Sequence, residues 1–517
     1  MTRDAMTAAL ADGDRWDFIV VGGGATGLGV AMDAASRGYA TLLLEQGDFA
    51  QGTSSRSTKL VHGGVRYLQQ GNVALVIEAL KERGLLLSNA PHLVRNLSFV
   101  VPNYEWWEGP FYGIGLKMYD LLAGKQGFGR SKILSRERTL QLLPTLEPEG
   151  LNGGVIYYDG QFDDARLAVA MARTAAEQGA VVLNYVRVTG LLHRDGEVAG
   201  VRARDVESGR DHELSARVVV NAAGAWTDEV RRMDQPTAPP IIRPSQGVHL
   251  VLPREFLPGE SAIMVPKTDD GRVLFAIPWL DRVVVGTTDT AIDEAPLEPV
   301  PFQDEVDFLL EHACRYLHRD PGPEDVLSVF AGIRPLVATE AKDDTASLSR
   351  DHTLLISESG LVTIAGGKWT TYRKMAEDTV DQAATLAGLD DRPCVTRDLH
   401  IHGHHAQAER FGALATYGSD APAIRGIMRE APGLDEPLHP SFATRAGEIV
   451  WFVREEMART VDDVLARRSR SLVLDARAAM EIAPRVAELM AVELGRDEAW
   501  QRDQVDAFRT LAEGYLP

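Results

Sequence analysis

A glycine-rich turn between an apolar strand and a helix limits what this chain can fold into more than any other feature of the sequence. Residues 17–45 read as a strand (DFIVVGG), a turn, a helix (ATGLGVAMDAASRG) and a second strand (YATLLLE), which together make one βαβ unit. Gly22, Gly24 and Gly27 form the pattern GxGxxG directly after the first strand. Such glycines permit a tight turn, a close approach of a pyrophosphate to the backbone, and close packing of helix against strand. The sequence therefore predicts a Rossmann-like dinucleotide-binding domain.

The same turn predicts where the diphosphate of the dinucleotide binds. Unpaired N–H groups and the positive end of the helix dipole attract phosphate to the start of the helix. Glu45 ends the second strand, where an acid can accept hydrogen bonds from the adenosine ribose hydroxyls. The predicted contacts at this end of the cofactor are Gly22, Gly23, Gly24, Ala25, Thr26, Gly27 and Glu45.

The order of the later segments favours FAD over NAD. A nicotinamide enzyme usually places its substrate domain after one Rossmann domain, whereas here strands that fit such a domain recur near residues 181, 218 and 361. This interleaved order is typical of flavoproteins. We found no second GxGxxG, so the sequence predicts no separate NAD(P) domain, and a reduced flavin would have to pass its electrons elsewhere.

The length of the chain and its local residue patterns predict several domains. With 517 residues, the chain is too long for one core, so two or three domains are expected. We expect an α/β fold in which a Rossmann-like FAD-binding domain, of the glutathione-reductase or amino-acid-oxidase type, is interleaved with an antiparallel-sheet substrate domain and followed by a C-terminal helical domain. The expected bounds are 14–90, 151–240 and 351–392 for the FAD-binding domain, 91–150 and 241–350 for the substrate domain, and 393–517 for the helical domain.

Charge and cysteine content exclude several classes of function. The net charge of −20 repels phosphate backbones, so nucleic acid is not an expected partner. An anionic substrate would need a local cluster of Arg and Lys. Cys314 and Cys394 are far apart and form no CxxC pair, which argues against a disulfide framework, a dithiol centre and a thiolate metal site, and fits a reducing cytoplasm. The tract HIHGHH at 400–405 contains no carboxylate or Cys, and we predict no metal site there.

No segment of the sequence is long enough to predict a membrane span. The N-terminus lacks the apolar stretch of a secretory signal, and the longest early uncharged run, Phe18–Met32, is shorter than the roughly 20 residues that cross a bilayer. Residues 104–122 (YEWWEGPFYGIGLKMYDLL) are aromatic and amphipathic. They fit either a helix on a membrane surface or a helix that packs its apolar face internally.

Several motifs relate the chain to a known family. GTSSRSTKLVHGGVRYL (52–68) follows Glu45, and later come DDARL (163–167), NAAGAW (221–226), GVHLVLP (247–253), AGIRPL (331–336), GGKWTTYRKMAE (366–377) and TVDDVLARR (460–468). Through these motifs the chain resembles, over nearly its whole length, the FAD-dependent glycerol-3-phosphate dehydrogenases, which are the quinone-linked, aerobic enzymes. The residues themselves suggest no role for TVDDVLARR.

The resemblance implies further contacts with the flavin. The serine-rich segment would run beneath the cofactor and contribute Thr53, Ser54, Ser57, Lys59, Leu60 and Gly64. A second glycine pair and the helix that follows it would stabilise the negative charge of the reduced flavin, because a helix N-terminus and an ammonium group both favour it. The residues in this second set are Gly366, Gly367, Lys368 and Thr370.

The resemblance also implies a substrate site. Arg66, Tyr67 and Arg334 would reach the pocket, where guanidinium groups suit a phosphate because they donate two hydrogen bonds at once and stay charged. Oxidation of a secondary alcohol needs a base near its hydroxyl proton. His249 and His62 are both candidates, and the sequence does not decide between them.

The activity that the resemblance implies is oxidation of sn-glycerol 3-phosphate to dihydroxyacetone phosphate, with hydride transfer to flavin N5 and electrons passed to a membrane quinone. Attachment would be peripheral, on the inner, cytoplasmic face of the cell membrane, and a homodimer is compatible with the sequence. Two alternatives stay open, an oxidase that uses dioxygen and a related FAD-dependent amine or amino-acid oxidase. From a different class, a non-catalytic flavin-binding protein is also considered, and the net charge disfavours one that acts on RNA.

Overall fold

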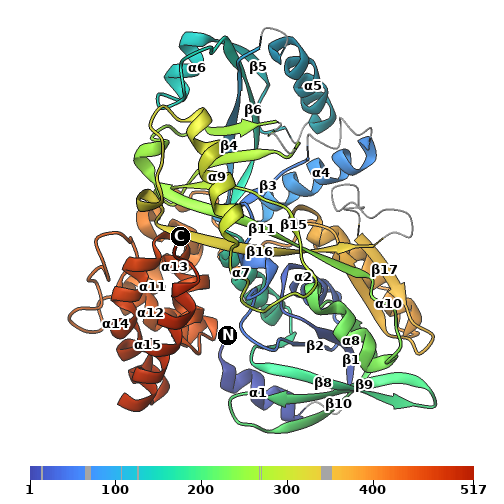
Figure 1. Cartoon of the computed structure of the whole chain (residues 1–517). Coiled ribbons are helices and arrows are strands. Elements are labelled where there is room, and N and C mark those ends of the chain that lie inside the picture. Colours follow the sequence, from blue (N-terminus) through green and yellow to red (C-terminus); the bar gives the residue numbers. More distant parts are fainter. Residues whose placement is uncertain are drawn as a thin grey trace.

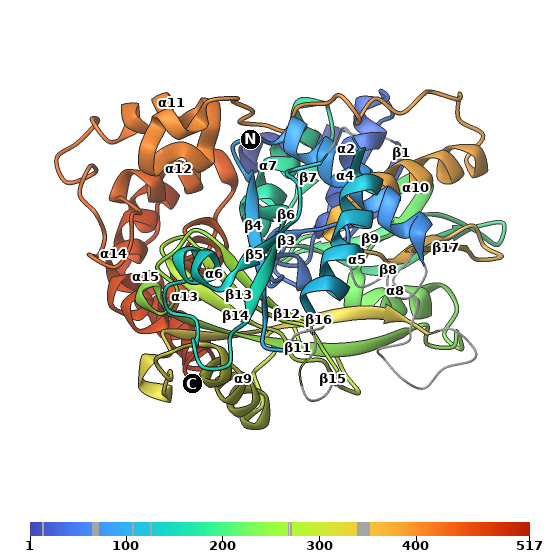
Figure 2. The ribbon, with the colours of Figure 1, turned by 90° about the horizontal axis from the view of Figure 1, so that it is seen from above.

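The structure is a computed structural model that describes residues 1–12, 15–64, 72–105, 108–124, 127–266, 268, 271–338 and 352–517. Two sheets and a helical lobe lie around one centre (Figure 1). The first sheet and its helices lie at the lower right of that view, the second sheet lies above them, and the C-terminal helices form a separate group on the left. Figure 2 shows the same separation from above, with α11 to α15 on the side opposite α10.

The first sheet is parallel at its centre and carries the predicted Rossmann strands. Its eight strands include a path in the order β17-β18-β10-β1-β2-β7. Val21 at the end of β1 pairs with Asn221 of β10 and with Leu44 of β2, so the carboxyl ends of these strands meet at one edge. The bounds are β1 (Trp16–Val21), β2 (Thr41–Leu44), β7 (Val181–Leu183), β8 (Val186–Arg194), β9 (Glu197–Asp205), β10 (Asp211–Asn221), β17 (His352–Ile356) and β18 (Val362–Gly366).

Helices cover this sheet and bury its strands. α2 (Ala25–Ser36) packs between α7 (Asp164–Glu177) and α10 (Tyr372–Leu386). Phe18, Ile19 and Val20 of β1 are fully buried, as expected for a parallel strand that is covered on both faces. The smaller elements on this side are α1 (Arg3–Asp12), α8 (Thr227–Asp234) and the 3-10 turns η1 (Thr53–Ser55), η3 (Gly224–Trp226) and η7 (Trp369–Thr371).

The second sheet is almost entirely antiparallel, as expected for the substrate domain. Its ten strands include a path in the order β15-β11-β14-β13-β12-β4-β6-β3, with β16 paired to β11 and β5 paired to β6. The bounds are β3 (Leu60–Val61), β4 (Val94–Asn103), β5 (Lys132–Ser135), β6 (Gly153–Phe162), β11 (Ile242–Pro253), β12 (Ala262–Val265), β13 (Leu274–Trp279), β14 (Arg282–Gly286), β15 (Thr290–Ala291) and β16 (Ser328–Val337). The helices and turns on this side are α4 (Val73–Asn89), α5 (Glu108–Ala123), α6 (Arg136–Leu142), α9 (Gln303–Tyr316), η4 (Arg254–Phe256) and η5 (Pro323–Asp325).

Two strands lie in the second sheet although the expected domain bounds place them in the FAD-binding domain. β6 pairs with β4 along its whole length, from Val94 opposite Phe162 to Asn103 opposite Gly153, and β3 pairs with β6. The sequence does not show which strand pairs with residues 153–162, since the partner is chosen by register over a distance of about sixty residues. The polypeptide returns to the first sheet only at α7.

The C-terminal lobe is helical, as predicted, and packs against the second sheet. Trp279 and Phe330 from that sheet belong to the same buried apolar cluster as Ile449 and Leu472 of the lobe. Residues 442–468, whose pattern is typical of one helix, do not form a continuous helix, because Met457 adopts a left-handed conformation at the end of α12. The elements are η8 (Ala408–Asp420), α11 (Ala421–Ile427), α12 (Ala446–Glu456), the π-helical turn η9 (Asp463–Arg468), α13 (Ser471–Leu474), α14 (Ala476–Leu494) and α15 (Glu498–Glu513).

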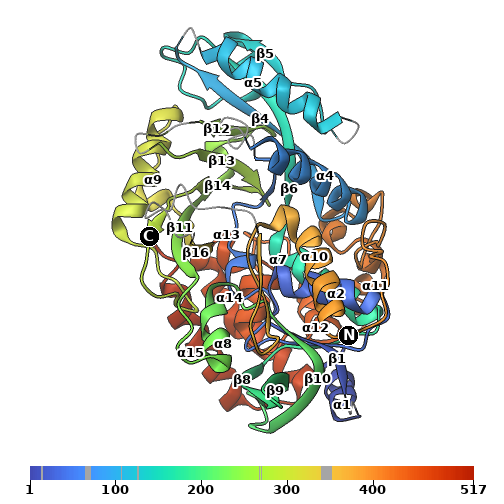
Figure 3. The same cartoon turned by 90° about the vertical axis from the view of Figure 1, so that its right-hand side faces the viewer.

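The amphipathic segment after residue 104 forms α5, which lies beside β5 at one end of the molecule (Figure 3). The segment does pack inward through part of its surface, since Leu116 and Tyr119 are buried. Its other face is apolar and exposed. Trp106 and Trp107 lie outside the described residues. Within the described ranges, every helix is too short or too polar to cross a bilayer.

Candidate functional site

Two adjoining cavities lie where the first sheet faces the second. The first cavity is lined by the turn after β1, by Glu45 and by the loop after β10, and the second by β11, β16 and the segment 53–64. Ligands of open α/β sheets bind outside the carboxyl ends of the strands, which is where the first cavity lies. The linings of both cavities include Thr53, Pro335, Gly366, Gly367, Lys368 and Trp369. The two cavities therefore form one elongated site with a shared middle.

The predicted glycine turn has the geometry that its spacing requires. Gly22 has a φ of 110°, and a Cβ atom there would lie 2.6 Å from the carbonyl oxygen of Ala222. A Cβ atom on Gly27 would lie 1.9 Å from the carbonyl oxygen of Gly22, so the helix can approach the strand only with glycine there. α2 begins after Gly24 without a side-chain cap. Of the predicted residues, Gly22, Gly24, Ala25, Thr26 and Glu45 line the first cavity.

Glu45 is held at the cavity wall by backbone amides. Its carboxylate accepts hydrogen bonds from the N–H of Gly23 at 2.6 Å and from the N–H of Gly47 at 2.8 Å. Burial raises the pKa of Glu45, although both amides oppose this. Gly23 thus contributes through Glu45. The predicted contact of Glu45 with a ribose remains a prediction, and each carboxylate oxygen can still accept a further hydrogen bond.

The serine-rich segment joins the two cavities. Ser54 Oγ accepts a hydrogen bond from the N–H of Ala25 at 2.9 Å, which ties the segment to the start of α2. Thr53 Oγ1 donates to the carbonyl of Ile333 in β16 at 2.5 Å. Ser57 donates from both its N–H and its hydroxyl to Asp164. Thr53 and Ser54 line the first cavity, and Thr53, Ser57, Leu60 and Gly64 line the second.

Lys59 is placed differently from the expectation that it contacts the cofactor. Its ammonium group is fully buried and lies 2.7 Å from Asp164 and 2.8 Å from the carbonyl oxygen of Ser55. It also lies over the rings of Trp279 and Phe330. Burial lowers the pKa of Lys59 to about 7, against the attraction of Asp164. The ammonium therefore supports the segment from behind, and it does so because Asp164, far along the chain, provides the nearest counter-charge.

His249 lies on β11 with its imidazole in the wall of the second cavity. The ring stacks on Phe330 with centroids 4.7 Å apart, and Nε2 lies 2.9 Å from Thr58 Oγ1. A Cβ atom at Gly286, opposite on β14, would lie 2.2 Å from the ring. Burial, followed by the positive charges of Lys59 and Arg334, holds the pKa of His249 well below its usual range. At neutral pH the imidazole is therefore uncharged.

Arg334 extends from β16 into the same cavity. Its guanidinium donates to Thr287 Oγ1 at 3.1 Å and lies 3.4 Å from a carboxylate oxygen of Asp289. The side chain keeps 26% of its surface exposed, so it can meet a ligand. A second guanidinium, Arg272, lines this cavity as well. No motif distinguishes Arg272 in the sequence, and only the fold brings it there.

The second glycine pair forms the shared middle of the site. Gly366 and Gly367 both have positive φ, 74° and 75°, and Lys368 follows in an extended conformation as the residue before η7. The helix expected after the glycine pair starts with this 3-10 turn and continues as α10. Thr370 exchanges hydrogen bonds with the backbone of His62, and both line the second cavity.

The two candidate bases therefore share one cavity, while Arg66 and Tyr67 lie outside the described residues.

The described residues include no group of three or more His, Cys, Asp or Glu side chains able to hold a metal ion. In the histidine tract, His402 lies between Glu177 and Asp420, at 2.5 and 2.7 Å. These contacts connect α7 to the C-terminal lobe.

The residues of the elongated site fit FAD. Glycine backbone at the start of an uncapped helix suits a pyrophosphate, and a fixed acid at the tip of the second strand suits an adenosine ribose. The site then continues past Gly366 and Gly367 into the second cavity. The joined cavities therefore offer space for both halves of FAD. Large side chains would block both glycine turns.

Comparisons with known proteins agree with this geometry. Residues 17–373 match the family model described as FAD dependent oxidoreductase, and residues 360–501 match the C-terminal domain of alpha-glycerophosphate oxidase. The chain is 41% identical over 540 residues to the mitochondrial glycerol-3-phosphate dehydrogenase of Mus musculus, covering 98% of this chain and 74% of the relative. The enzyme of Homo sapiens is 40% identical over 543 residues, with the same coverage.

Solved structures agree as well. The glycerol-3-phosphate dehydrogenase from Bacillus halodurans, complexed with FAD, superposes with a TM-score of 0.82 at 31% identity and covers 100% of this chain and 98% of its own. The L-alpha-glycerophosphate oxidase from Mycoplasma pneumoniae shares the fold, with a TM-score of 0.58 at 17% identity over 74% of this chain and 97% of its own. The chain belongs to the FAD-dependent glycerol-3-phosphate dehydrogenase family, and its cofactor is FAD.

Proposed function

We propose that the protein oxidises sn-glycerol 3-phosphate to dihydroxyacetone phosphate and passes the electrons to a membrane quinone. The observation that carries the proposal is the second cavity, which joins the cofactor site and whose lining includes three arginines, Arg56, Arg272 and Arg334, and two histidines, His62 and His249. A local positive charge of this kind lets an anionic substrate bind to a chain whose net charge is −20. The names of the relatives support the substrate.

Arg334 binds the phosphate of the substrate. Its planar guanidinium stays charged at every working pH and can donate two parallel hydrogen bonds. Thr287 and Asp289 fix its direction. Arg272 adds a second positive charge in the same cavity, and Arg66, which the resemblance assigns to this pocket, would add a third. Positioning of this kind can remove roughly 7–11 kcal/mol from a reaction barrier.

His249 accepts the proton of the C2 hydroxyl. Its low pKa keeps the ring neutral, and the neutral ring has one nitrogen free to accept a proton. Thr58 fixes the orientation of the ring through Nε2. His62 stays the second candidate, since it lines the same cavity. FAD supplies the acceptor for the C2 hydride, and Lys368, in the wall shared by both cavities, favours the negative charge that this transfer adds.

Electrons leave for a quinone at the membrane. An apolar stripe on α5 supports attachment, because Phe111, Ile114, Met118 and Leu121 are each at least half exposed and their spacing places them on one face of the helix. Ile133 on the neighbouring β5 is exposed as well. The net charge disfavours electrostatic attachment to anionic lipid. We therefore propose apolar, peripheral attachment on the cytoplasmic side of the cell membrane, with α5 in contact with the lipid.

A second candidate acceptor is dioxygen. The match of residues 360–501 to the C-terminal domain of alpha-glycerophosphate oxidase favours this alternative. In that case the protein forms hydrogen peroxide and needs no membrane.

The two acceptors can be separated on purified protein. Glycerol 3-phosphate added without air should bleach the flavin absorbance, and a quinone analogue should then restore it faster than air does. Bleaching that only dioxygen reverses, with a stoichiometric yield of peroxide, would identify an oxidase. A flavin that glycerol 3-phosphate leaves unbleached would contradict the proposed substrate.

A further inference from the structure

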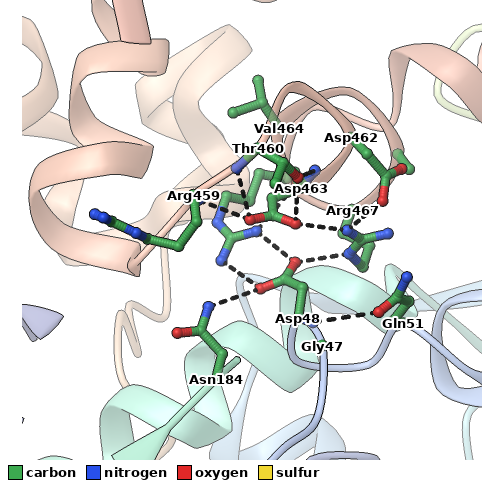
Figure 4. A network of polar contacts seen from close by, with 12 residues as sticks. Gly47, Asp48, Gln51, Asn184, Arg459, Thr460, Asp462, Asp463, Val464 and Arg467 are labelled. Atoms are coloured by element: carbon green, nitrogen blue, oxygen red, sulfur yellow. Dashed lines mark hydrogen bonds and ion pairs between the residues drawn. The ribbon is translucent and has the colours of Figure 1, made fainter. Parts of the chain in front are cut away.

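A buried ionic network joins the C-terminal lobe to the loop that follows Glu45 (Figure 4). Asp48 in that loop is fully buried. Its carboxylate accepts a hydrogen bond from Arg467 Nε at 2.6 Å and two from the guanidinium of Arg468, at 2.7 and 3.0 Å. Both arginines come from the π-helical turn η9 and are themselves at most 2% exposed. Two guanidinium groups of the lobe therefore converge on one carboxylate of the loop.

The lobe also holds the far end of the same loop. Arg470 donates hydrogen bonds to the carbonyl of Ser55 and to Asp164, both at 2.9 Å. The Lys59 ammonium donates to the same carbonyl. Three residues of the lobe, Arg467, Arg468 and Arg470, thus reach the loop at two points. Between and beside these points lie the cofactor-facing residues Glu45, Thr53 and Ser54.

Further contacts, made mostly by residues of the lobe, fix the direction of the arginine side chains. Asp463, at the start of η9, accepts hydrogen bonds from the N–H groups of Arg459 and Thr460 and from Arg467, and Tyr185 donates to it as well. Figure 4 shows the carboxylates of Asp463 and Asp48 one above the other, each joined to Arg467 by a dashed line. Burial alone would raise the pKa of Asp48, but the two arginines hold it below its usual range.

A network of this kind is costly to break. A buried carboxylate that loses its cationic partners keeps the cost of its burial, so breaking such a pair is strongly destabilising. The network therefore holds the loop 45–55 in the position in which it contacts the lobe. That position brings the carboxylate of Glu45 to the wall of the first cavity and Ser54 Oγ to the start of α2.

We infer that Arg467, Arg468 and Arg470 are positioning residues for FAD, which hold the loop 45–55 in the conformation that binds the adenosine diphosphate half of the cofactor. The affinity for FAD then depends on the docking of the C-terminal lobe, and by linkage FAD strengthens that docking. The inference depends on FAD as the cofactor, and not on the proposed substrate or acceptor. It also gives a physical role to the motif TVDDVLARR, which contributes Asp463, Arg467 and Arg468.

The direct test is the affinity for FAD of the Asp48→Asn variant, measured by the fluorescence of FAD released from the holoprotein on dilution. The matched control is Asp33→Asn. Asp33 is also fully buried and pairs with an arginine, Arg37, at 2.5 Å. It lies on α2 eight residues beyond Ala25, about 12 Å from the start of the helix.

We expect FAD to bind the Asp48→Asn variant about 5- to 150-fold more weakly, the usual range for coupled sites, and to bind the Asp33→Asn variant as it binds the parent. Equal FAD affinity in the Asp48→Asn variant and the parent would overturn the inference. An equal loss in both variants would also overturn it, because the effect would then follow from general loss of stability.

A milder pair of variants covers the case in which Asp48→Asn does not fold. Arg467→Lys keeps the positive charge but loses the Nε hydrogen bond to Asp48, and Arg454→Lys makes the same change at the Arg454–Glu493 pair inside the lobe. Only Arg467→Lys should weaken FAD binding, and an unchanged affinity would contradict the inference. In the parent, removal of FAD should speed hydrogen exchange of amides 460–470, and unchanged exchange there would contradict the linkage.

Discussion

The two ends of the elongated site are formed by different kinds of chemical group. The first cavity, where we propose the adenosine half of FAD binds and which we call the adenosine end, consists of backbone amides, glycines and one fixed carboxylate at the ends of neighbouring parallel strands. The second cavity, the proposed substrate end, includes charged and titratable side chains from separate strands of the second sheet. Backbone groups keep their dipoles at any pH and cannot change rotamer, whereas His249 and Arg334 depend on their neighbours for charge and direction.

The difference separates two tasks. A cofactor that stays bound needs a rigid surface without reactive groups, and glycine turns provide this. A substrate that must bind, react and leave needs groups that change charge or accept a proton. The ends meet at Gly366, Gly367 and Lys368, which line both cavities. Substitutions at the adenosine end should abolish FAD binding. Substitutions at the substrate end should leave a protein that binds FAD, and is therefore yellow, but turns over slowly.

The largest effect is expected from Gly22→Val. The valine Cβ would lie within 2.6 Å of the carbonyl oxygen of Ala222, at a φ of 110° that branched residues rarely adopt. The turn would have to move, and with it the amides that we propose hold the pyrophosphate. We expect the purified variant to lack flavin, as judged by the absorbance spectrum and by flavin released on heating. The control is Gly115→Ala on α5, where a Cβ atom meets nothing within 4 Å. A yellow Gly22→Val variant would show that the turn is not the main cofactor contact.

Next in size is His249→Gln. Loss of a general base typically slows a reaction about 10²–10⁴-fold, and glutamine is close to histidine in volume. We expect kcat to fall in this range in steady-state assays with glycerol 3-phosphate, while the flavin stays bound. The matched variant is His62→Gln, from the same cavity. If His62→Gln lowers kcat more than His249→Gln does, the assignment of the two imidazoles is reversed.

A smaller loss is expected from Arg334→Ala. Removal of one partner of a charged contact costs about 2–5 kcal/mol, and here the substitution removes the guanidinium that we propose binds the substrate phosphate. We expect most of the change in KM, because the phosphate contact exists before the reaction as well as during it. Arg272→Ala should cause a similar change in KM if both guanidinium groups contact the phosphate. A change confined to kcat would place Arg334 at the reacting carbon instead.

The contrast between the ends also decides how much of the site could be predicted from the sequence. The turn, Glu45 and the strands that carry them lie within residues 17–45, so local spacing was enough. The role of Lys59 was not predictable, because its counter-charge, Asp164, lies 105 positions away. Arg272 carries no distinguishing pattern, and Arg467 and Arg468 acquire a role only through Asp48, more than 400 positions earlier. Local spacing predicts elements, but only register and packing choose the partners of charged side chains.

The smallest effect concerns pH and follows from the neutral, buried His249. Its pKa is lowered in the folded protein, so between pH 6.5 and this lower value the unfolded chain binds the proton that the folded chain does not. The contribution of His249 to stability is therefore fully present above pH 6.5 and is lost as the pH falls. Relative to His249→Gln, the parent should lose about 1 kcal/mol in its free energy of unfolding for one pH unit below 6.5, as measured by urea denaturation at pH 7.5 and 5.5. The adenosine end offers a comparison without titration, since Gly22→Ala should change the free energy of unfolding equally at both values. If the parent and His249→Gln differ by the same amount at both pH values, the imidazole is not held neutral by its surroundings, and the base at the substrate end must be sought elsewhere.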